Sequence, residues 1–593
     1  MPQPTYTLLL NEHSARETAL RQQLRWMSMA RLLSFIFVLA ALYYFIRYNI
    51  GWAGLLSLPL LALFVWLVRR YEATSRKTSL TTALKQINKT ELELLNGASS
   101  PYDAGAAFTD PRHPYAYDLD LFGEGSLYQY LNRTTHLYGE KRLAAVLLQP
   151  DIREITARQE AIRELSANTA FRQLVQAHGL LHRSEEKKID QLRRWLGAAP
   201  AFRNKLAYYL LCLFPLFTCT ALIVYGVTDS GIWKSAAGFS FVVNLIITAL
   251  FARKLLSYIS YSSGINHTLQ QFAGQLETIQ NETFRSPLLQ RLQDQLKNGN
   301  ITAGASIREL ASGFNYLDTV YNVFVSPLIN GLFLFHIHIL YRLDQWKQEH
   351  QSAIWNWLQL TGEIEALNSL AGYGFNNPGT VFPELRNSPC LEALEMGHPL
   401  IKASHRICND LVLDRQQLVI LTGSNMSGKS TFLRTVGINL VLARCGAPVC
   451  ASSFAFYPFD LMVSMRISDS LQDSESFFYA ELKRLKQIID HLDAGHKSFI
   501  LLDEILRGTN SNDKHNGTVG LLEQLRIRPA TGIIATHDIT VAALTEKYPD
   551  QVQAQCFESE IINGELIFDY RIRPGVCSTL SASFLMKKLG IIS

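Results

Sequence analysis

The sequence predicts a mostly α-helical chain that carries two apolar helical hairpins and ends in an α/β domain with parallel strands. Paired apolar runs occur twice before residue 255, and amphipathic segments with helical periodicity surround them. From about Leu394 onward, short apolar runs alternate with amphipathic stretches. The mean hydropathy of +0.05 is high for a chain in which 18% of the residues are charged, and it indicates membrane segments.

The first pair of apolar runs covers residues 32–46 and 52–68, with a short polar break between them. Each run is somewhat shorter than the ~20 residues that cross a bilayer comfortably. Basic residues flank the pair on both outer sides, whereas the break contains only Arg47. By the positive-inside rule both outer flanks are cytoplasmic. We therefore predict that an N-terminal segment, residues 1–95, forms an arm and a transmembrane hairpin.

The second pair covers residues 206–226 and 232–252 and repeats the charge pattern, with Lys205 before it and Arg253 after it. It predicts a second transmembrane hairpin within residues 205–254. The protein would then be a multi-pass protein of the inner or cytoplasmic membrane, with its C-terminal domain in the cytoplasm. The alternative is that each pair forms a buried hairpin in a large soluble core.

The segments around the second hairpin, residues 96–204 and 255–390, are predicted to be helical. Apolar residues recur at intervals of three and four in 154–177, with charges on the other face. A fifth apolar stretch, residues 321–341, contains a proline, two asparagines and two histidines, which are costly in lipid. We expect a core helix there, whose histidines pack against neighbours or face a partner rather than bind a metal.

Charge and cysteine content place few limits on function. The formal net charge of +5 permits contact with nucleic acid, but no region carries a dense basic stripe. The eight cysteines form no CxxC pair and lie at no zinc-finger spacing. We therefore expect reduced thiols and assign neither a metal site nor a disulfide to them.

The C-terminal domain, residues 391–593, contains a phosphate-loop pattern. Residues 418–422, 498–502 and 532–535 are candidate buried strands of a parallel sheet. The sequence GSNMSGKS at 423–430 fits GxxxxGK[ST], follows the first strand and opens an amphipathic helix. Such a loop surrounds phosphates with backbone N–H groups, and the helix N-terminus favours their negative charge. The pattern predicts a P-loop NTPase that binds ATP and Mg²⁺.

The side chains expected to carry the chemistry lie in this loop and at the ends of the other two strands. Lys429 would contact the β- and γ-phosphates, and Ser430 would bind Mg²⁺. Asp503 would hold the same ion through water, and Glu504 would orient or deprotonate the attacking water. His537 would sense the γ-phosphate. The less specific interpretations are a carboxylate pair on the surface and a hydrogen-bonded histidine at a strand end.

Further motifs carry a resemblance to a known family. The loop resembles that of the MutS (DNA mismatch repair) family, usually GPNM-small-GKST; Asn425 and Met426 are its diagnostic residues, and Ser424 replaces the usual proline. The other similar motifs are GHP at 397–399, ND at 409–410, SFFYAE at 476–481, DEILRGT at 503–509, ATH at 535–537 and RPG at 573–575. A less specific resemblance to the opening of the family's core, or lever, domain includes Asp118, NRT at 132–134 and Arg158-Gln159. Together the similar regions cover most of 115–180 and 315–593.

The resemblance implies an ABC/MutS-type ATPase domain that dimerises head to tail. Ser476 would contact the γ-phosphate bound to the other subunit, and residues 507–510 would line the dimer interface. The aromatic residue that usually stacks on adenine falls near Arg406 or Ile407, which leaves base selectivity open. The residues implied to bind ATP are Gly423, Ser424, Asn425, Met426, Ser427, Gly428, Lys429, Ser430 and Thr431, with Ser476 in trans, and the implied catalytic residues are Glu504, His537 and Lys429.

The expected function is therefore that of a membrane-anchored MutS-like ATPase that works as a dimer and couples ATP hydrolysis to the binding of mismatched or branched DNA in repair. DNA enters this expectation only through the resemblance. We expect the chain to lack the family's mismatch-recognition domain, and the second hairpin falls roughly where the family inserts its DNA clamp. The alternatives are an ATP-driven transporter, which the missing LSGGQ signature disfavours, and a nucleotide-switched membrane scaffold with no DNA role.

Overall fold

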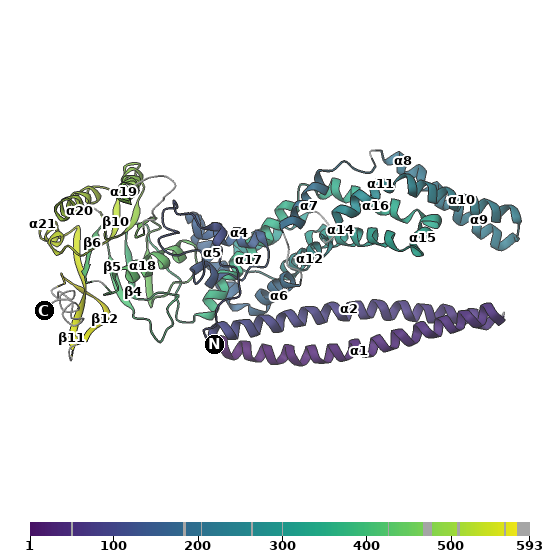
Figure 1. The fold of residues 1–593 in the computed structure, drawn as a ribbon, viewed down its shortest axis with the longest axis horizontal. Helices are drawn as coiled ribbons and strands as arrows, with labels where there is room; N and C mark the ends of the chain where they lie inside the picture. Colours follow the sequence, from purple (N-terminus) through teal and green to yellow (C-terminus); the bar gives the residue numbers. More distant parts are fainter. Residues whose placement is uncertain are drawn as a thin grey trace.

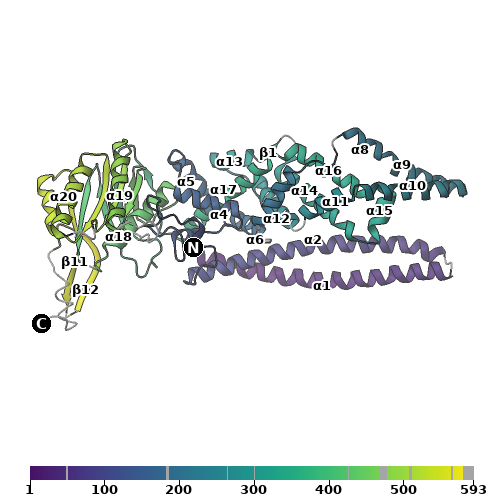
Figure 2. The same cartoon turned by 45° about the horizontal axis from the view of Figure 1, so that its top comes forward.

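The computed structural model describes residues 1–593 except 49–50, 182–185, 203, 263–264, 299–300, 425, 467–476, 507–509, 563–564 and 578–593. The molecule is elongated, with the β-sheets at one end and helical hairpins at the other (Figure 1). A helical body lies between these ends. The long N-terminal hairpin runs beside this body in both views (Figure 2).

The N-terminal hairpin consists of α1 (Pro2–Tyr48) and α2 (Gly51–Leu95). The two helices pack against each other along their length, and α2 also contacts α6 of the body. Both extend far beyond the predicted apolar runs, because their polar stems are helical too. The stems are tied by Glu17, which accepts hydrogen bonds from Lys85 at 2.9 Å and from Arg21 at 2.6 Å. The apolar runs therefore occupy the tip, and polar stems connect them to the body.

The second hairpin consists of α8 (Lys205–Leu211), α9 (Leu213–Thr228) and α10 (Gly231–Leu250). Asp229, with a φ of 50°, ends α9 and starts the turn. Thr218 of α9 lies 2.6 Å from the hydroxyl of Ser240, and Asn244 donates to the hydroxyl of Thr218 at 3.0 Å. These polar side chains of α9 and α10 are thus used to hold the two helices together.

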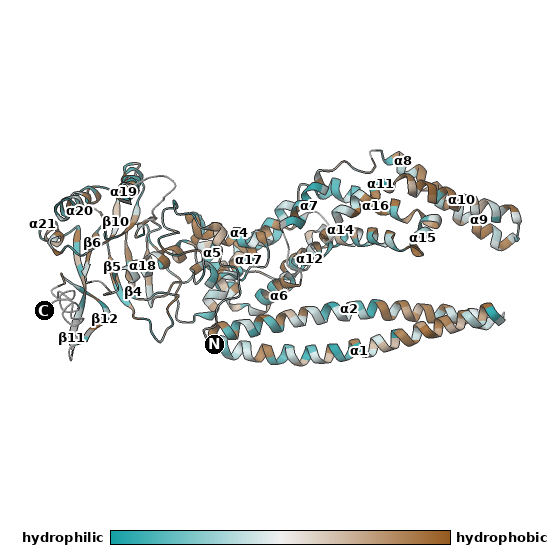
Figure 3. Ribbon diagram, in the orientation of Figure 1, coloured by the Kyte–Doolittle hydropathy of each residue, from teal (hydrophilic) through white to brown (hydrophobic). Residues whose placement is uncertain are grey.

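Within the part of the chain that the structure describes, four helical segments are long and apolar enough to cross a membrane, judged by length and composition: α1, α2, the α8–α9 segment Lys205–Thr228, and α10. Apolar residues gather towards the tips of both hairpins, at the end of the molecule farthest from the sheets (Figure 3). Many of these side chains face outward, including Leu55, Leu216 and Phe239. Membrane insertion itself stays a prediction.

The helical body is formed by α3–α7 and α11–α17. In chain order its elements are α3 (Leu127–Leu131), α4 (Leu137–Leu148), α5 (Ile155–Ala167), α6 (Thr169–Leu180), α7 (Glu186–Gly197), α11 (Ala252–Ser262), α12 (Ile265–Asn281), α13 (Pro287–Asp294), β1 (Lys297–Asn298), β2 (Ile301–Thr302), α14 (Ala303–Asp318), α15 (Val325–Phe333), α16 (Phe335–His350) and α17 (Ile354–Asn376). The predicted helical character of this region is confirmed. Its central helix, α17, packs against α4 and α5 and leads into the C-terminal domain.

The apolar stretch 321–341 does not form the single core helix that the sequence predicts. It contains α15 and the start of α16, which meet at Leu334, whose φ of 51° interrupts the helical path. Helix α15 packs against α10 and α9, and Phe324 beside it is 90% exposed. The prediction of burial was therefore wrong for the first half of the stretch, where packing on one side leaves the other side open.

The two histidines of this stretch are held by hydrogen bonds, as expected for packed side chains. His336 is buried and lies within hydrogen-bonding distance of the Asn330 amide. His338 lies 2.9 Å from the hydroxyl of Tyr208 in α8. Both histidines thus help to join α15 and α16 to their surroundings.

A buried polar cluster lies between α17 and the start of α4. The carboxylate of Glu365 accepts hydrogen bonds from the hydroxyl of Thr135 and, at 2.8 Å, from Gln275, and it lies 3.4 Å from Nε2 of His136. Burial raises the pKa of Glu365 to about 7 and lowers the pKa of His136 to about 3. Burial therefore favours the neutral form of both groups.

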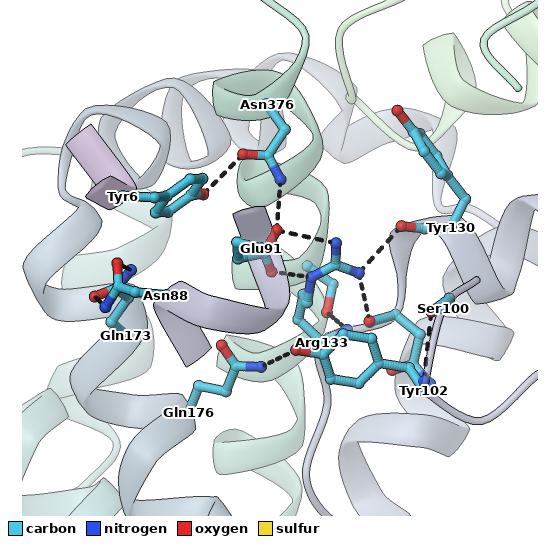
Figure 4. Close-up of polar contacts among 12 residues, drawn as sticks. Tyr6, Asn88, Glu91, Ser100, Tyr102, Tyr130, Arg133, Gln173, Gln176 and Asn376 are labelled. Atoms are coloured by element: carbon cyan, nitrogen blue, oxygen red, sulfur yellow. Dashed lines mark hydrogen bonds and ion pairs between the residues drawn. The ribbon is translucent and has the colours of Figure 1, made fainter. Parts of the chain in front are cut away.

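The base of the N-terminal hairpin is joined to the body by a second buried network (Figure 4). Glu91 of α2 forms an ion pair with Arg133. Asn376, the last residue of α17, donates to Glu91 at 2.9 Å and accepts from the hydroxyl of Tyr6 in α1 at 2.7 Å. Burial raises the pKa of the Tyr102 hydroxyl, which lies under the Arg133 guanidinium, to about 12. Helices α1, α2 and α17 are thus connected by one network of hydrogen bonds and an ion pair.

The described residues of the C-terminal domain form two sheets. The first has the strand order β12-β11-β6-β10-β9-β8, and all neighbouring pairs except β11–β12 are parallel. The second, mostly antiparallel sheet has the order β3-β7-β4-β5. The strands are β3 (Glu384–Leu385), β4 (Leu391–Met396), β5 (Asn409–Leu413), β6 (Leu418–Gly423), β7 (Ser453–Phe456), β8 (Asp460–Ser464), β9 (Ser498–Asp503), β10 (Ala530–Thr536), β11 (Val552–Ile562) and β12 (Glu565–Pro574). The three predicted parallel strands are β6, β9 and β10.

The parallel sheet is buried on both faces, which explains the unbroken apolar runs of its central strands. On one face, Leu421 and Leu501 pack with α18 (Lys429–Arg444) in a core that continues into the helical body. On the other face, Ile420 and Ile500 pack with α19 (Phe477–Asp493) and α20 (Ser511–Arg526). The helix that follows the glycine-rich loop is therefore in the same core as the body.

Candidate nucleotide-binding site

The carboxyl ends of β6, β9 and β10 lie side by side and bring the predicted site residues together. Thr422 is paired with Thr536, and Asp503 with Ala535. The loop after β6, the acidic residues after β9 and the histidine after β10 therefore project from the same edge of the sheet. This edge is where ligands bind in open parallel sheets.

The loop between β6 and α18 has the backbone shape of a phosphate cradle. Gly423 and Gly428 have φ values of 155° and 104°. A Cβ atom on Gly423 would lie 2.8 Å from Oγ of Ser427 and 3.0 Å from the carbonyl oxygen of Phe557. Glycine is thus required there both by conformation and by space. Helix α18 starts directly at Lys429, so its N-terminus points at the loop.

The lysine of the loop lies between the loop carbonyls and the histidine. Nζ of Lys429 donates to the carbonyl oxygens of Gly423 at 2.7 Å and Ser424 at 3.0 Å, and it lies 3.5 Å from Nδ1 of His537. Nδ1 of His537 lies 2.9 Å from the carbonyl oxygen of Gly423. The imidazole of His537 therefore lies within hydrogen-bonding distance of both the loop carbonyl and the lysine.

The other nitrogen of this histidine is directed at the acidic residue after β9. Nε2 of His537 contacts Oε1 of Glu504. The backbone N–H of Glu504 donates to the carbonyl oxygen of Ala535 at 3.0 Å, and its φ of 51° turns the side chain away from the strand direction. The following backbone is held by the buried carboxylate of Glu481 in α19, which accepts from the N–H of Leu506 at 2.6 Å. The carboxylate of Glu504 is thus positioned from β10 and α19.

The predicted magnesium ligands are in direct contact. The hydroxyl of Ser430 donates to Oδ2 of Asp503 at 2.5 Å, and Asp503 is 7% exposed. A hydroxyl and a carboxylate are oxygen donors of the kind that Mg²⁺ prefers. The buried hydroxyls of Ser424 and Ser427 have no hydrogen-bond partner among the described residues, as expected where phosphate oxygens would accept. The residues therefore fit a bound Mg·nucleotide.

A cavity of about 430 Å³ lies beside the loop, lined by His398, His405, Ile407 and Tyr570 among others. Burial, together with nearby arginines, lowers the pKa of His398 to about 4, so this imidazole is neutral. Tyr570, on β12, lies against the loop, because a Cβ atom on Gly428 would be 3.0 Å from its ring. Sequence motifs did not indicate Tyr570, since only the β11–β12 hairpin brings it to the loop.

Arg406 does not line this cavity, although it was one of the two positions predicted beside the base. Its guanidinium donates to the carbonyl oxygen of Ile401 at 2.6 Å and to Sγ of Cys450 at 2.8 Å. These bonds direct it into the protein. Ile407 is 41% exposed and does line the cavity, so of the two positions it is the one that can contact a base. Three groups of predicted residues, namely Asn425, Ser476 and 507–509, lie outside the described residues.

The end of α18 is capped by the helical body. Arg158 of α5 donates to the carbonyl oxygens of Cys445 at 2.9 Å and Arg444 at 3.0 Å. Asp118 accepts from the backbone N–H groups of Met465 and Arg466, both at 2.7 Å. Asp118 and Arg158 were singled out by the resemblance to the lever domain. Arg158 connects the helical body to α18, which follows the loop, and Asp118 connects it to the end of β8, which lies beside β9.

A parallel sheet with this loop before α18 and an acidic strand end on β9 defines a P-loop nucleotide-binding domain. Comparison with known proteins identifies its family. Residues 419–587 match the family model of MutS domain V. This match places the C-terminal domain in the MutS family.

The relatives are DNA mismatch repair and related proteins. The chain is 30% identical over 252 residues to DNA mismatch repair protein MutS of Thermotoga maritima, which covers 41% of this chain and 31% of the relative. It is 26% identical over 492 residues to that of Thermosynechococcus vestitus, covering 76% and 55%. It is 26% identical over 264 residues to Endonuclease MutS2 of Streptococcus uberis, covering 43% and 32%. The matches thus span between about a third and about half of the relatives' length.

Proposed function

We propose that the protein is a membrane-anchored, MutS-like ATPase that binds and hydrolyses ATP with Mg²⁺ between β6, β9 and β10. The observation that carries this proposal is the convergence of Lys429, Ser430, Asp503, Glu504 and His537 at one edge of the sheet. A cation, a hydroxyl, two carboxylates and an imidazole around one phosphate loop are the groups that transfer of a phosphoryl group to water requires.

The loop and its lysine would bind the phosphates. Lys429 would turn from the carbonyl groups of Gly423 and Ser424 to the β- and γ-phosphates and exchange neutral acceptors for charged ones. The N–H groups at the start of α18 would bind phosphate oxygens. The cavity beside Ile407 and Tyr570 would receive the base.

The strand ends would position the water. Ser430 and Asp503 would hold Mg²⁺, which supplies neutralisation of charge on the phosphates. Glu504 would accept a proton from the attacking water or orient it. The contact of His537 with Glu504 favours one position of that carboxylate, and the imidazole lies close enough to Lys429 to respond to a γ-phosphate there.

Lys429→Met tests the assigned site. We expect ATP turnover of the purified full-length protein in detergent to fall by at least about 100-fold, because the variant removes charge that acts on the transferred group. Lys486→Met is the matched control, since Lys486 is an exposed residue of α19 that pairs with Asp490, and it should keep full turnover. An unchanged rate in Lys429→Met would refute the site.

A composite dimer site is part of the proposal and follows from the resemblance. If Ser476 contacts the nucleotide of the other subunit, Ser476→Ala should lower turnover and leave ATP binding by a single subunit intact. Mixing this variant with Lys429→Met gives a direct test, because one of the two sites in a mixed dimer then has an intact lysine and an intact serine. Turnover regained on mixing supports the dimer, whereas no recovery in proven mixed dimers argues against it.

Membrane anchoring is supported by the arrangement of the apolar helices. The tips of α1–α2 and α9–α10 lie at the same end of the long axis in both views (Figure 1, Figure 2). One bilayer perpendicular to this axis could therefore contain both. No charged side chain occurs between Asp318 and Arg342, and the exposed residues Phe324 and Leu328 beside the second hairpin suit the same apolar surroundings.

The topology can be tested with inserted protease sites. A site after Asp229, in the exposed turn of the second hairpin, should be cleaved only from the outside of intact cells or spheroplasts. A matched site after Gly379, between α17 and the sheets, should be cleaved only after lysis. Cleavage at both positions only after lysis, together with full extraction by alkaline carbonate, would refute the anchor without affecting the ATPase assignment.

DNA coupling is proposed because the relatives are named as DNA mismatch repair proteins. ATP turnover should change on addition of mismatched or branched DNA and less on addition of matched duplex. Turnover that is indifferent to every DNA would remove DNA from the proposal. A transporter is less well supported, because Thr218, Ser240 and Asn244 are engaged in contacts between helices, which leaves them poorly placed to line a path.

A further inference from the structure

Two histidines and an aspartate converge at the edge of the parallel sheet that is opposite to the phosphate loop. Asp460 is the first residue of β8, His491 is in the last turn of α19, and His496 precedes β9. Nε2 of His491 and Nδ1 of His496 lie 3.2 Å and 3.3 Å from the same atom, Oδ2 of Asp460. One ligand atom from each residue lies within 4.8 Å of the others.

The backbone holds these three residues close together. Gly495 has a φ of 88°, and its N–H donates to the carbonyl oxygen of Leu492 at 2.9 Å, which ends α19 in a tight turn. This turn brings His496 back beside His491, so that the two imidazoles stack with centroids 4.2 Å apart. The N–H of Asp460 donates to the carbonyl oxygen of Lys497 at 3.0 Å. The start of β8 is thus fixed to the segment that carries His496.

The cationic side chains around Asp460 do not approach the carboxylate oxygen that faces the two histidines. Arg444 lies 3.6 Å from the other oxygen, Oδ1, of Asp460. The ammonium group of Lys497 lies over the ring of Tyr457, 5.0 Å from its centroid. Arg528 pairs with Asp493. Lys497 and Arg528 therefore have other partners, Arg444 approaches Asp460 at Oδ1, and Oδ2 is the oxygen that faces both imidazoles.

The two nitrogen–oxygen distances suit a transition-metal ion, and the stacked imidazoles would turn on binding so that the plane of each ring contains it. Two ligand atoms at about 2.0–2.1 Å from a tetrahedral Zn²⁺ ion are separated by about 3.3–3.4 Å, close to the two distances measured to Oδ2 of Asp460. Two imidazole nitrogens and one carboxylate favour Zn²⁺ or a similar ion over Mg²⁺, which prefers oxygen ligands. The side chains of His491 and His496 are 28% and 53% exposed, so an ion and its water ligand can reach them.

We propose that Asp460, His491 and His496 form a binding site for one zinc-like divalent ion that braces α19 against the parallel sheet. The site is separate from the proposed ATPase chemistry, because it lies at the amino ends of β8 and β9 rather than at their carboxyl ends. It acts on α19, the helix whose Glu481 holds the backbone after Glu504. A zinc ion bound there would therefore stabilise the fold around the nucleotide-binding site without contacting the nucleotide.

The test uses the untagged full-length protein in detergent, without nucleotide, so that neither a histidine tag nor bound phosphate competes for metal. Equilibrium dialysis against ZnCl₂ with metal analysis should give one high-affinity zinc per chain. His496→Gln, a change at a half-exposed residue, and His491→Gln should each weaken this binding by more than about tenfold. Zinc should also raise the unfolding temperature of the wild type but not of the His491→Gln/His496→Gln double variant.

His515→Gln is the matched control, because His515 of α20 forms a similar pair with Asp538, at 2.7 Å, beyond the carboxyl end of β10. It should bind zinc like the wild type. Absence of zinc binding by the wild type would overturn the proposal. So would equal zinc binding by folded His491→Gln and His496→Gln variants, since the ion would then be held elsewhere, for example by cysteine thiols. Loss of binding confined to the two variants supports the site.

Discussion

Replacing Glu365 by glutamine should change how the stability of the helical body depends on pH. Burial raises the pKa of Glu365 from the usual 4.5 to about 7. The folded protein therefore keeps a proton that the unfolded chain releases, and the free energy of unfolding falls as the pH rises from about 4.5 to about 7. At about 1.4 kcal/mol per pKa unit this loss amounts to about 3 kcal/mol.

The neighbouring histidine acts in the opposite direction. The pKa of His136 is lowered from 6.5 to about 3, so the unfolded chain binds the extra proton, and the free energy of unfolding falls as the pH drops below about 6.5. In the wild type the two effects largely cancel between pH 4.5 and 6.5. Glu365→Gln removes one of them, and its carbonyl oxygen can still accept from Thr135.

Denaturant unfolding of the wild type and Glu365→Gln in detergent, followed by circular dichroism from pH 4.5 to 7.5, measures the difference. We expect the variant to gain about 3 kcal/mol relative to the wild type over this range. A difference that is constant with pH would refute the reasoning. A relative loss at high pH would show that Glu365 and His136 form a buried ion pair instead.

Two further substitutions test the connection of the body to the sheet and the packing of the sheet itself. Arg158→Met should destabilise the C-terminal domain by about 3 kcal/mol, because two buried carbonyl groups lose a charged donor. Thermal unfolding followed by circular dichroism measures this loss of stability. An unchanged midpoint of unfolding would show that Arg158 does not stabilise the end of α18. Gly532→Ala should prevent folding of the parallel sheet, because its Cβ atom would lie 2.0 Å from the carbonyl oxygen of Ile500. Gly520→Ala is the control, because Gly520 of α20 has open space around it; this variant should be as stable as the wild type or slightly more so. Equal yields of folded Gly532→Ala and Gly520→Ala protein in size-exclusion chromatography would contradict the packing argument.

The parallel core of the C-terminal domain could be predicted because each of its strands has a strong local signal. Residues 418–422, 498–502 and 532–535 are short and apolar throughout, as strands buried on both faces must be. The second sheet could not be found in this way. It includes β3, which is two residues long, and its strands are identified by their pairing rather than by a local pattern.

The helical break within 321–341 lacked a local signal as well. Leu334, the residue with positive φ, is neither glycine nor asparagine, and tertiary packing alone determines its conformation. The apolar character of the stretch was plain, but apolar sequence does not distinguish a side chain that faces a core from one that faces lipid. The structure separates buried from exposed side chains, since Phe324 is exposed and His336 is buried.

Within the site, the side chains around the glycine-rich loop were predictable and those that line the cavity beside it were not. Lys429, Ser430, Asp503, Glu504 and His537 follow strands of one sheet, so their proximity follows from topology. Tyr570 reaches the loop from a late hairpin, and the direction of a side chain such as Arg406 depends on bonds to distant residues. Such contacts are set by the whole fold.

The length of the N-terminal hairpin turns a small rotation into a large displacement. Helix α1 has 47 residues, and at 1.5 Å per residue it is about 70 Å long. The network of Tyr6, Glu91, Arg133 and Asn376 joins the base of this hairpin to the helical body. A rotation of about 5° at that end would carry the far tip by about 6 Å, more than one turn of helix. Ångström-scale rearrangements near the end of α17 would thus be amplified at the far tip of the N-terminal hairpin.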